Sequence, residues 1–240
     1  MATPPEESAL DGVEIRNLTA RSDLAAASEV LQQVWGSATP LVAIELLRAI
    51  EHSGGYVAGA FDHERMVGAS FGWLARHRDQ PALHSHVTGI LPGVRHTGIG
   101  RAIKQHQRRW ALDRGLDWIT WTFDPLVRVN AWFNIGVLGA EVADYVENFY
   151  GEMTDSMNAN DESDRLVAAW PVTTSIEHAP GVRTIEVATP DDIVMLRRTD
   201  PAEAQRWRLQ VRTALEEAFA AGGRVRSFSR DGAYVIEFTS

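Results

Sequence analysis

The sequence of 240 residues contains no cysteine. Disulfide bonds, thiolate metal ligands and a cysteine nucleophile are therefore excluded, and the absence favours a reducing compartment. No apolar run approaches the roughly 18 residues that a helix needs to cross a bilayer. The first 11 residues carry two prolines and acidic side chains but no hydrophobic stretch. We therefore expect a disordered lead-in over 1–11 in place of a signal peptide, no membrane partner, and a cytoplasmic protein.

Positive charge is also in short supply. Lysine and arginine total 23 against 32 aspartate and glutamate residues, so the formal net charge is -9. This balance argues against nucleic acid as a partner. The eight histidines are scattered, and the one close pair, His84 and His86, has no evident third ligand, so no metal site is predicted. The Gly-x-Ser-x-Gly pattern of a serine nucleophile is absent as well.

The sequence does contain strand and helix patterns separated by stop signals. Apolar–polar alternation predicts strands, and apolar residues at helical spacing predict helices. Ser22 is the expected cap of the first helix, Gly36 its end, and Pro40 the start of the second helix. Expected strands cover 13–18, 56–61, 66–74, 82–91, 117–123, 140–146 and 165–172, and expected helices cover 22–35, 40–55, 98–114 and 129–138.

A smaller region follows a boundary near 173–181. Thr189 and Asp200 each precede a proline, as helix caps do, and Asp231-Gly232 is a typical hairpin turn. We expect 182–240 to form a C-terminal α+β subdomain that packs on the core. The expected apolar stripe of its longer helix consists of Trp207, Val211, Leu215 and Phe219.

The stretch VRHTGIGRAI, residues 94–103, joins an expected strand to an expected helix. The first turn of a helix has backbone N–H groups without partners, and such groups bind phosphate oxygens. Gly98 and Gly100 let a ligand approach the backbone closely, and Arg95 adds positive charge. A nucleotide P-loop is excluded because no Gly-Lys-Ser/Thr ending follows, and the dinucleotide fingerprint fails at Ile103. The turn therefore predicts a site for a pyrophosphate.

The helix that follows this turn is expected to be amphipathic. Ile99 and Trp110 belong to its predicted inward face, and Lys104 and Arg108 to its predicted outward face. The basic outward face is interpreted as a solvated surface, given the overall acidity of the chain.

Several stretches resemble the GNAT superfamily of N-acyltransferases. GILPGVRHTGIG at 89–100 is similar to the family's acyl-CoA loop, and NAWFNIGVLGA at 130–140 resembles its asparagine-led helix before a Leu-Gly step. The order of expected elements over about 12–172 also matches. WTFDPL, NFYGEM and Ser163-Asp164-Arg165 look like a poorly characterised branch. The resemblance implies an α/β GNAT fold over 12–173, with a mixed, mostly antiparallel central sheet flanked by helices.

The resemblance also implies acetyl-CoA, or another acyl-CoA, as co-substrate. The strands at 83–91 and 117–123 would splay apart and admit the pantetheine arm, and a backbone N–H at Ile90 or Leu91 would polarise the acyl carbonyl. The implied cofactor-binding residues are Ile90, Leu91, Arg95, His96, Thr97, Gly98, Ile99, Gly100, Arg101 and Asn130.

Two residues are candidates for handling the acceptor amine. Asp124 ends the strand at 117–123, where the acyl site should open, so it is expected to deprotonate the amine or hold its ammonium form. The alternative is a turn residue before Pro125. His86 suits proton removal at neutral pH, and its alternative is a half-buried structural role.

The proton donor for the thiolate is harder to place. The tyrosine that many relatives carry falls on Ile135, and Asn130 is displaced from the family's asparagine position. Tyr145 and Tyr150 lie further on, and we expect Tyr150 to take the role. Its alternative is an aromatic side chain at the rim of the core.

These observations predict an acyl-CoA-dependent N-acetyltransferase that moves an acetyl group to a primary amine of a small molecule or peptide in a ternary complex. One alternative is a non-catalytic acyl-CoA sensor or interaction module, which the missing tyrosine favours. Another is a structural partner whose C-terminal hairpin extends the sheet of a second protein. A homodimer is one of the assembly states that the sequence leaves open.

Overall fold

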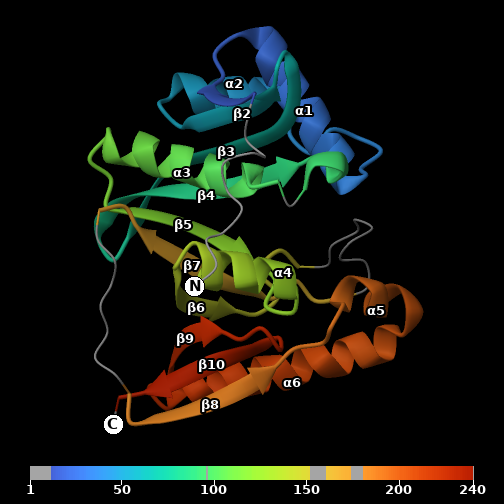
Figure 1. Cartoon of the computed structure of the whole chain (residues 1–240), viewed down its shortest axis with the longest axis vertical. Helices are drawn as coiled ribbons and strands as arrows, with labels where there is room; N and C mark the ends of the chain where they lie inside the picture. Colours follow the sequence, from blue (N-terminus) through green and yellow to red (C-terminus); the bar gives the residue numbers. More distant parts are fainter. Residues whose placement is uncertain (1–11, 96, 152–160, 174–180, 240) are drawn as a thin grey trace. The chain divides into compact units, whose positions relative to one another are not determined.

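The computed structural model describes residues 12–95, 97–151, 161–173 and 181–239 (Figure 1). The expected lead-in and His96 lie outside the described residues. The strands form a seven-stranded, mixed and mostly antiparallel sheet in the order β1-β2-β3-β4-β5-β7-β6 and a separate small sheet in the order β8-β10-β9. The chain divides into two compact units, Met1–Ile119 and Thr120–Ser240, with the boundary inside β5 (Trp118–Phe123).

The first unit contains strands β1 to β4, which pair antiparallel in chain order. Hairpins connect β2 to β3 and β3 to β4, so the polar turns at 63–64 and 78–79 set their registers. The strands are β1 (Val13–Asn17), β2 (Tyr56–Asp62), β3 (Arg65–His77) and β4 (Gln80–Ile90), and the helices are α1 (Arg21–Trp35), α2 (Ile44–His52), η1 (Pro92–Val94) and α3 (Ile99–Leu112).

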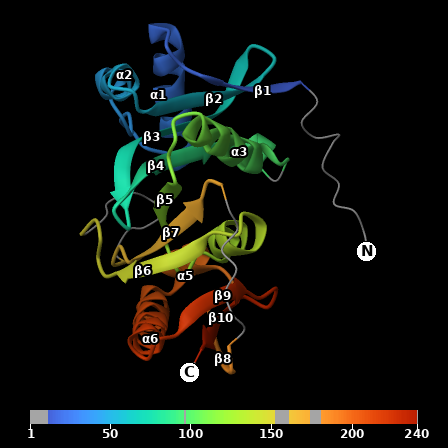
Figure 2. The same ribbon diagram turned by 90° about the vertical axis from the view of Figure 1, so that its left-hand side faces the viewer.

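Helices cover both faces of these four strands, as Figures 1 and 2 allow the reader to follow. Side chains alternate across a strand, so the neighbours Met66 and Val67 on β3 point to opposite faces. Met66 belongs to the larger apolar cluster, which α1 and α2 complete with residues such as Leu31 and Leu47. Val67 belongs to a smaller cluster completed by Ile103 of α3. The core of this unit is therefore two apolar layers with β1 to β4 between them.

The helix signals of the first unit are partly confirmed. Gly36 ends α1 with φ 61°, a left-handed conformation that favours glycine. The expected cap at Ser22 is wrong, because α1 begins at Arg21 and its preceding residue, Ala20, makes no side-chain cap. The expected start at Pro40 is also wrong, because α2 begins at Ile44.

The second unit contains the rest of β5 and all later elements. β6 pairs antiparallel with β7, and β10 pairs antiparallel with β8 on one side and β9 on the other. None of the helices in the described residues is long and apolar enough to cross a bilayer. The elements are α4 (Arg128–Ala131), η2 (Trp132–Val137), β6 (Glu141–Val146), β7 (Arg165–Pro171), β8 (Arg183–Ala188), α5 (Ile193–Thr199), α6 (Pro201–Ala220), β9 (Arg224–Phe228) and β10 (Ala233–Phe238).

Aspartates cap both C-terminal helices. The side chain of Asp200 accepts an N–H from the first turn of α6, as the sequence predicts. The expected cap at Thr189 is wrong, because the cap of α5 is Asp192 and the Thr189 hydroxyl donates to the carbonyl of Gly232 at 2.7 Å. The sequence pattern therefore found both helices but placed one start three residues early.

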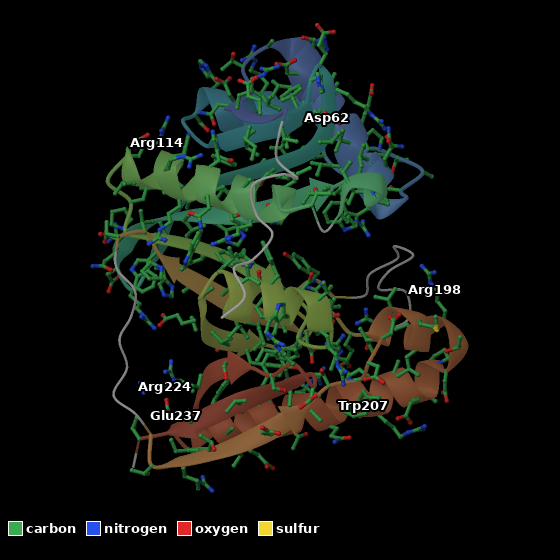
Figure 3. All side chains as sticks on the ribbon, in the orientation of Figure 1. Asp62, Arg114, Arg198, Trp207, Arg224 and Glu237 are labelled. Atoms are coloured by element: carbon green, nitrogen blue, oxygen red, sulfur yellow. The ribbon has the colours of Figure 1, made fainter. Side chains whose placement is uncertain are left out.

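The C-terminal hairpin turns at Asp231-Gly232, as predicted, and Gly232 has φ 84°. Arg224 on β9 and Glu237 on β10 lie side by side in Figure 3, with 3.4 Å between Nη2 and Oε2. The third strand of this small sheet, β8, has no counterpart among the expected elements.

Candidate active site

The glycine turn lies at the end of β4. The chain passes through η1 to Arg95, whose Nε donates to the carbonyl of Ile90 at 3.3 Å. Thr97 Oγ1 donates to the carbonyl of Val94 at 2.7 Å. Gly98 precedes α3 with φ 89°, which places it in the left-handed region where a side chain is strained. The first N–H groups of this 14-residue helix therefore follow Arg95 closely in the chain.

The second glycine of the turn has a different role from the first. Gly100 lies in the first turn of α3, and Gly98 is the only one of the two with a positive φ. Gly100 therefore contributes by having no side chain, which lets a ligand approach the helix N-terminus closely. Ile99, between them, is buried in the smaller apolar cluster and anchors the turn to the sheet.

Only one of the two backbone N–H groups expected to bind the acyl carbonyl remains a candidate for that role. The N–H of Leu91 donates to the carbonyl of Val67 on β3 at 2.9 Å, so it is engaged within the sheet. The prediction that the N–H of Leu91 donates to an acyl carbonyl is therefore wrong. Peptide groups of successive residues in a strand point to opposite sides, so the peptide of Ile90 points away from β3. Ile90 remains the candidate.

The face of α3 that packs on the sheet carries polar side chains that the sequence pattern missed. Lys104 was expected to face solvent, but it is 4% exposed and its Nζ donates to Ser85 Oγ at 3.0 Å. Gln107 Nε2 donates to the hydroxyls of Ser70 and Ser85, at 2.9 Å each. Burial lowers the pKa of Lys104 to about 7. The feature of the sequence that could have indicated this buried polar strip is the pair Ser70 and Ser85, which lie on the adjacent strands β3 and β4.

His86 occupies an irregular position of β4. Gly72 pairs with Ser85 and Phe71 pairs with Val87, so His86 is the extra residue of a β-bulge. Its Nδ1 is buried and has no hydrogen-bond partner. Burial also lowers the pKa of His86, so the imidazole is neutral at pH 7.

The ring of His86 belongs to a group of three that we call the ring cluster: Trp73, His84 and His86. The centroid of the Trp73 ring lies 5.1 Å from that of His84 and 4.7 Å from that of His86, and the two imidazoles are 5.8 Å apart. Burial, with smaller contributions from His86 and Lys104, lowers the pKa of His84 to about 4. Both imidazoles therefore accept hydrogen bonds and carry no charge at neutral pH.

Asp124 lies in the second unit, where two arginines bind it. Arg208 forms a two-point contact, with Nη1 3.0 Å from Oδ1 and Nη2 3.1 Å from Oδ2, and Arg197 Nη2 is 2.5 Å from Oδ2. The N–H of Leu126 also donates to Oδ1 at 2.9 Å. Burial would raise the pKa of Asp124, but the guanidiniums of Arg208 and Arg197 outweigh it and hold the pKa well below its usual range. A carboxylate held in this way is a weak base, and these contacts argue against the predicted role.

The same arginines bind a second carboxylate. Arg197 Nη2 and Arg208 Nη2 both lie 2.8 Å from Asp161 Oδ2. A third arginine of α6, Arg212, makes a two-point contact with Asp164, at 2.7 Å from Oδ1 and 2.9 Å from Oδ2. All three arginines belong to the C-terminal region, and all three carboxylates belong to the stretch before it. We call these six residues the arginine–carboxylate network.

Tyr150 is an exposed side chain of the second unit, with 43% of its surface accessible. Its hydroxyl lies 3.3 Å from Thr122 Oγ1 on β5, and the guanidinium of Arg165 lies 5.2 Å from its ring centroid. Its phenol can therefore donate a proton to a ligand. Asn130 is exposed on α4, while Ile135, at the family's tyrosine position, is buried on η2.

The candidate residues fall into two groups. The turn residues and His86 are brought together by β4 and the start of α3 in the first unit. Asp124, Tyr150 and Asn130 belong to the second unit. The residues that sequence reasoning missed are Trp73 and Lys104.

Comparison with protein families and with curated proteins gave no match to this chain. Solved structures do match. The ribosomal-protein-S18-alanine N-acetyltransferase from Escherichia coli aligns with TM-score 0.53 and 18% identity, over 70% of this chain and 98% of its own. The yncA structure from Salmonella typhimurium, with its cofactor acetyl-CoA, aligns with TM-score 0.54 and 15% identity, over 70% of this chain and 96% of its own.

A third match is to the NatC complex bound to Gag peptide and CoA, with TM-score 0.52 and 12% identity, over 67% of this chain and 99% of the matched chain. Identities this low establish similarity of fold. The small sheet formed by β8, β9 and β10 lies outside the matched part. Over about 70% of its length, this chain has the GNAT acetyltransferase fold.

Proposed function

We propose that this protein is an acyl-CoA-dependent N-acetyltransferase that moves an acetyl group from acetyl-CoA to a primary amine of a small molecule or peptide. The observation that carries the proposal is the turn from Arg95 to Gly100, with Gly98 at φ 89° at the start of α3. On the same fold, structural neighbours contain acetyl-CoA or CoA.

The turn supplies what a pyrophosphate needs. N–H groups at the start of α3 and the positive end of its dipole bind phosphate oxygens, and the guanidinium of Arg95 adds charge. Gly100 presents no side chain against the ligand. The remaining proposed contacts of the turn are Thr97, Ile99 and Arg101, with Asn130 on α4 and His96 outside the described residues.

The reaction joins the amine nitrogen to the acyl carbon and breaks the carbon–sulfur bond. One proton leaves the nitrogen and one proton ends on the sulfur, so the products are an amide and the free thiol of CoA. The N–H of Ile90 would stabilise the carbonyl oxygen as its negative charge grows. Because this donor is a backbone group, the apolar side chains at the end of β4 are compatible with the role.

We assign the proton acceptor to His86 in place of Asp124. The imidazole is neutral at pH 7, and it lies on the strand that leads to the turn.

Tyr150 is the proposed acid. Its exposed hydroxyl contacts only the Thr122 hydroxyl among the described residues, so the phenol proton is available to the thiolate or the acceptor. A thiolate leaves readily even unprotonated. Tyr150→Phe should therefore lower kcat by a smaller factor than the 10²-fold or more expected for His86→Gln, which removes the base.

Release of free thiol from acetyl-CoA across a panel of primary amines tests the proposal. The expected result is amine-dependent thiol release, with an acetylated product of matching mass. A second candidate function is an acyl-CoA sensor without turnover, which the buried Ile135 at the family's tyrosine position favours. Acetyl-CoA binding by calorimetry with no thiol release for any amine would support the sensor and reject the enzyme.

A further inference from the structure

The ring cluster forms a partly exposed aromatic surface on β3 and β4, in which Trp73 is exposed and the two imidazoles are half-buried. Trp73 pairs directly with His84 across the two strands, and 39% of its surface is accessible. The plane of Trp73 makes an angle of 38° with each imidazole, and the imidazoles make 39° with each other. Phe71 extends the group on its buried side, with its ring centroid 5.6 Å from that of His86. The three rings therefore offer a broad face to a planar ligand.

Each neutral imidazole of the ring cluster has one nitrogen that accepts a hydrogen bond, and the cluster provides no negative charge. Nδ1 of His86 is buried without a partner, and no carboxylate of the described residues pairs with either imidazole. The groups that act electrostatically on His84 are His86 and Lys104, and both are positive when they are charged. An alkylammonium group placed here would have no counter-ion.

The proton balance leads to the same preference. An alkylamine has a pKa near that of lysine, about 10.4, so it arrives protonated at pH 7. Transfer of its proton to His86 is unfavourable, because burial lowers the pKa of that imidazole below its usual range and far below the pKa of an alkylamine. An aromatic amine arrives neutral, and its N–H needs only the acceptor nitrogen of a neutral imidazole.

We infer that the acceptor is a planar aromatic primary amine, which stacks on Trp73 and donates its N–H to His86. This inference rests on the proposed function and narrows its substrate class. The amine nitrogen forms the bond to the acyl carbon, and its proton passes to His86 as the carbon–sulfur bond breaks. The CoA thiolate takes a proton from Tyr150, and the proton held by His86 returns through solvent to the Tyr150 phenolate, so the reaction needs no further reactant.

Four simple amines distinguish the effect of aromatic character from that of basicity, the two properties for which the ring cluster is expected to select. Aniline is aromatic and weakly basic, benzylamine is aromatic and strongly basic, 2,2,2-trifluoroethylamine is aliphatic and weakly basic, and cyclohexylamine is aliphatic and strongly basic. Thiol release at pH 7 should give aniline the highest kcat/KM. Trp73→Leu should raise the KM for aniline about tenfold and raise the KM for trifluoroethylamine by a smaller factor. The matched control, Trp207→Leu on α6, should change neither (Figure 3).

The outcomes separate this inference from the proposed function. Thiol release that is faster with benzylamine and cyclohexylamine than with aniline would keep the enzyme and overturn the aromatic acceptor. An aniline preference that survives Trp73→Leu would overturn the stacking role. Absence of thiol release with every amine would reject the proposed function and the acceptor role with it, whereas binding of aniline at the ring cluster is measured independently.

That independent measurement uses the imidazole nitrogens and works even if Trp73→Leu does not fold. In the wild-type protein labelled with 15N-histidine, aniline should shift the ring-nitrogen resonances of His86, and cyclohexylamine should not. The His86→Gln variant identifies these resonances by their loss. A spectrum that aniline leaves unchanged would overturn the inference.

Discussion

Asp124→Asn should destabilise the protein more than it impairs the chemistry. The substitution keeps the size of the side chain and removes its charge. Asn can still accept the N–H of Leu126, which Asp124 Oδ1 accepts at 2.9 Å. What it loses is the attraction for Arg197 and Arg208, whose side chains are 5% and 1% exposed.

The magnitude follows from what remains around the arginines. Removing one partner of a buried ion pair costs about 3–5 kcal/mol, because it leaves an uncompensated charge. Here Asp161 still binds both arginines at 2.8 Å, so two guanidiniums share one carboxylate. We therefore expect the lower end, about 3 kcal/mol of unfolding free energy. For a chain of this size that corresponds to a fall in Tm of roughly 6–12 °C.

Urea denaturation followed by tryptophan fluorescence measures this difference. The control is Glu203→Gln, which breaks the exposed pair between Glu203 and Arg206 and should cost about 0–1 kcal/mol. Acid provides a second readout. The folded-state pKa of Asp124 lies below its unfolded value of about 3.9, so its contribution is present above that pH and is lost as pH falls toward the folded pKa. The deficit of Asp124→Asn should therefore shrink below about pH 4.

One result would refute this reasoning. If Asp124→Asn unfolds at the same urea concentration as the wild-type protein, while its kcat/KM falls about 10²-fold, the carboxylate acts in the chemistry as a general base. The ion pairs would then contribute little to stability, and the assignment of the base to His86 would be wrong.

Three further predictions concern the turn, the helix behind it and the C-terminal hairpin. Gly100→Val should weaken acetyl-CoA binding at least tenfold, about 1.4 kcal/mol, without unfolding the protein, and calorimetry that finds equal affinity would contradict the pyrophosphate site. Lys104→Met should stabilise the protein at pH 7. Because the folded pKa of Lys104, about 7, lies below its unfolded value, wild-type stability should rise between pH 7 and 10 by up to about 1.4 kcal/mol per unit, and urea titrations of the variant should lack this slope. Gly232→Ala should lower Tm by several degrees, since an added Cβ would lie 2.2 Å from the guanidinium carbon of Arg128 and φ is 84°; an unchanged melting curve would show that the turn relaxes freely.

The sequence predicted features that depend on local chemistry. The left-handed Gly98, the cap at Asp200 and the turn at Asp231-Gly232 each follow from what one or two residues allow the backbone to do. The order of elements that gives the GNAT fold follows from periodicity and stop signals in the same way. These rules need no knowledge of the partner surface.

The sequence failed where burial depends on a distant partner. Lys104 looked like a solvent-facing helix residue, because the serines that receive its ammonium group lie on other strands. Asp124 looked like a catalytic carboxylate at a strand end, because its arginines follow more than 70 residues later. Trp73 drew no attention, since the cluster that it forms with His84 and His86 depends on the register of β3 and β4.

The arginine–carboxylate network has a consequence for how this protein can be divided. A chain cut at the end of β7 would keep Asp124, Asp161 and Asp164 and lose Arg197, Arg208 and Arg212. The three carboxylates would then lose the arginines that neutralise them, and each would have to be hydrated or protonated instead. Each ion pair of the network has its carboxylate before the cut and its arginine after it. We therefore expect the part of the chain with the recognisable fold to be less stable without the C-terminal region than with it.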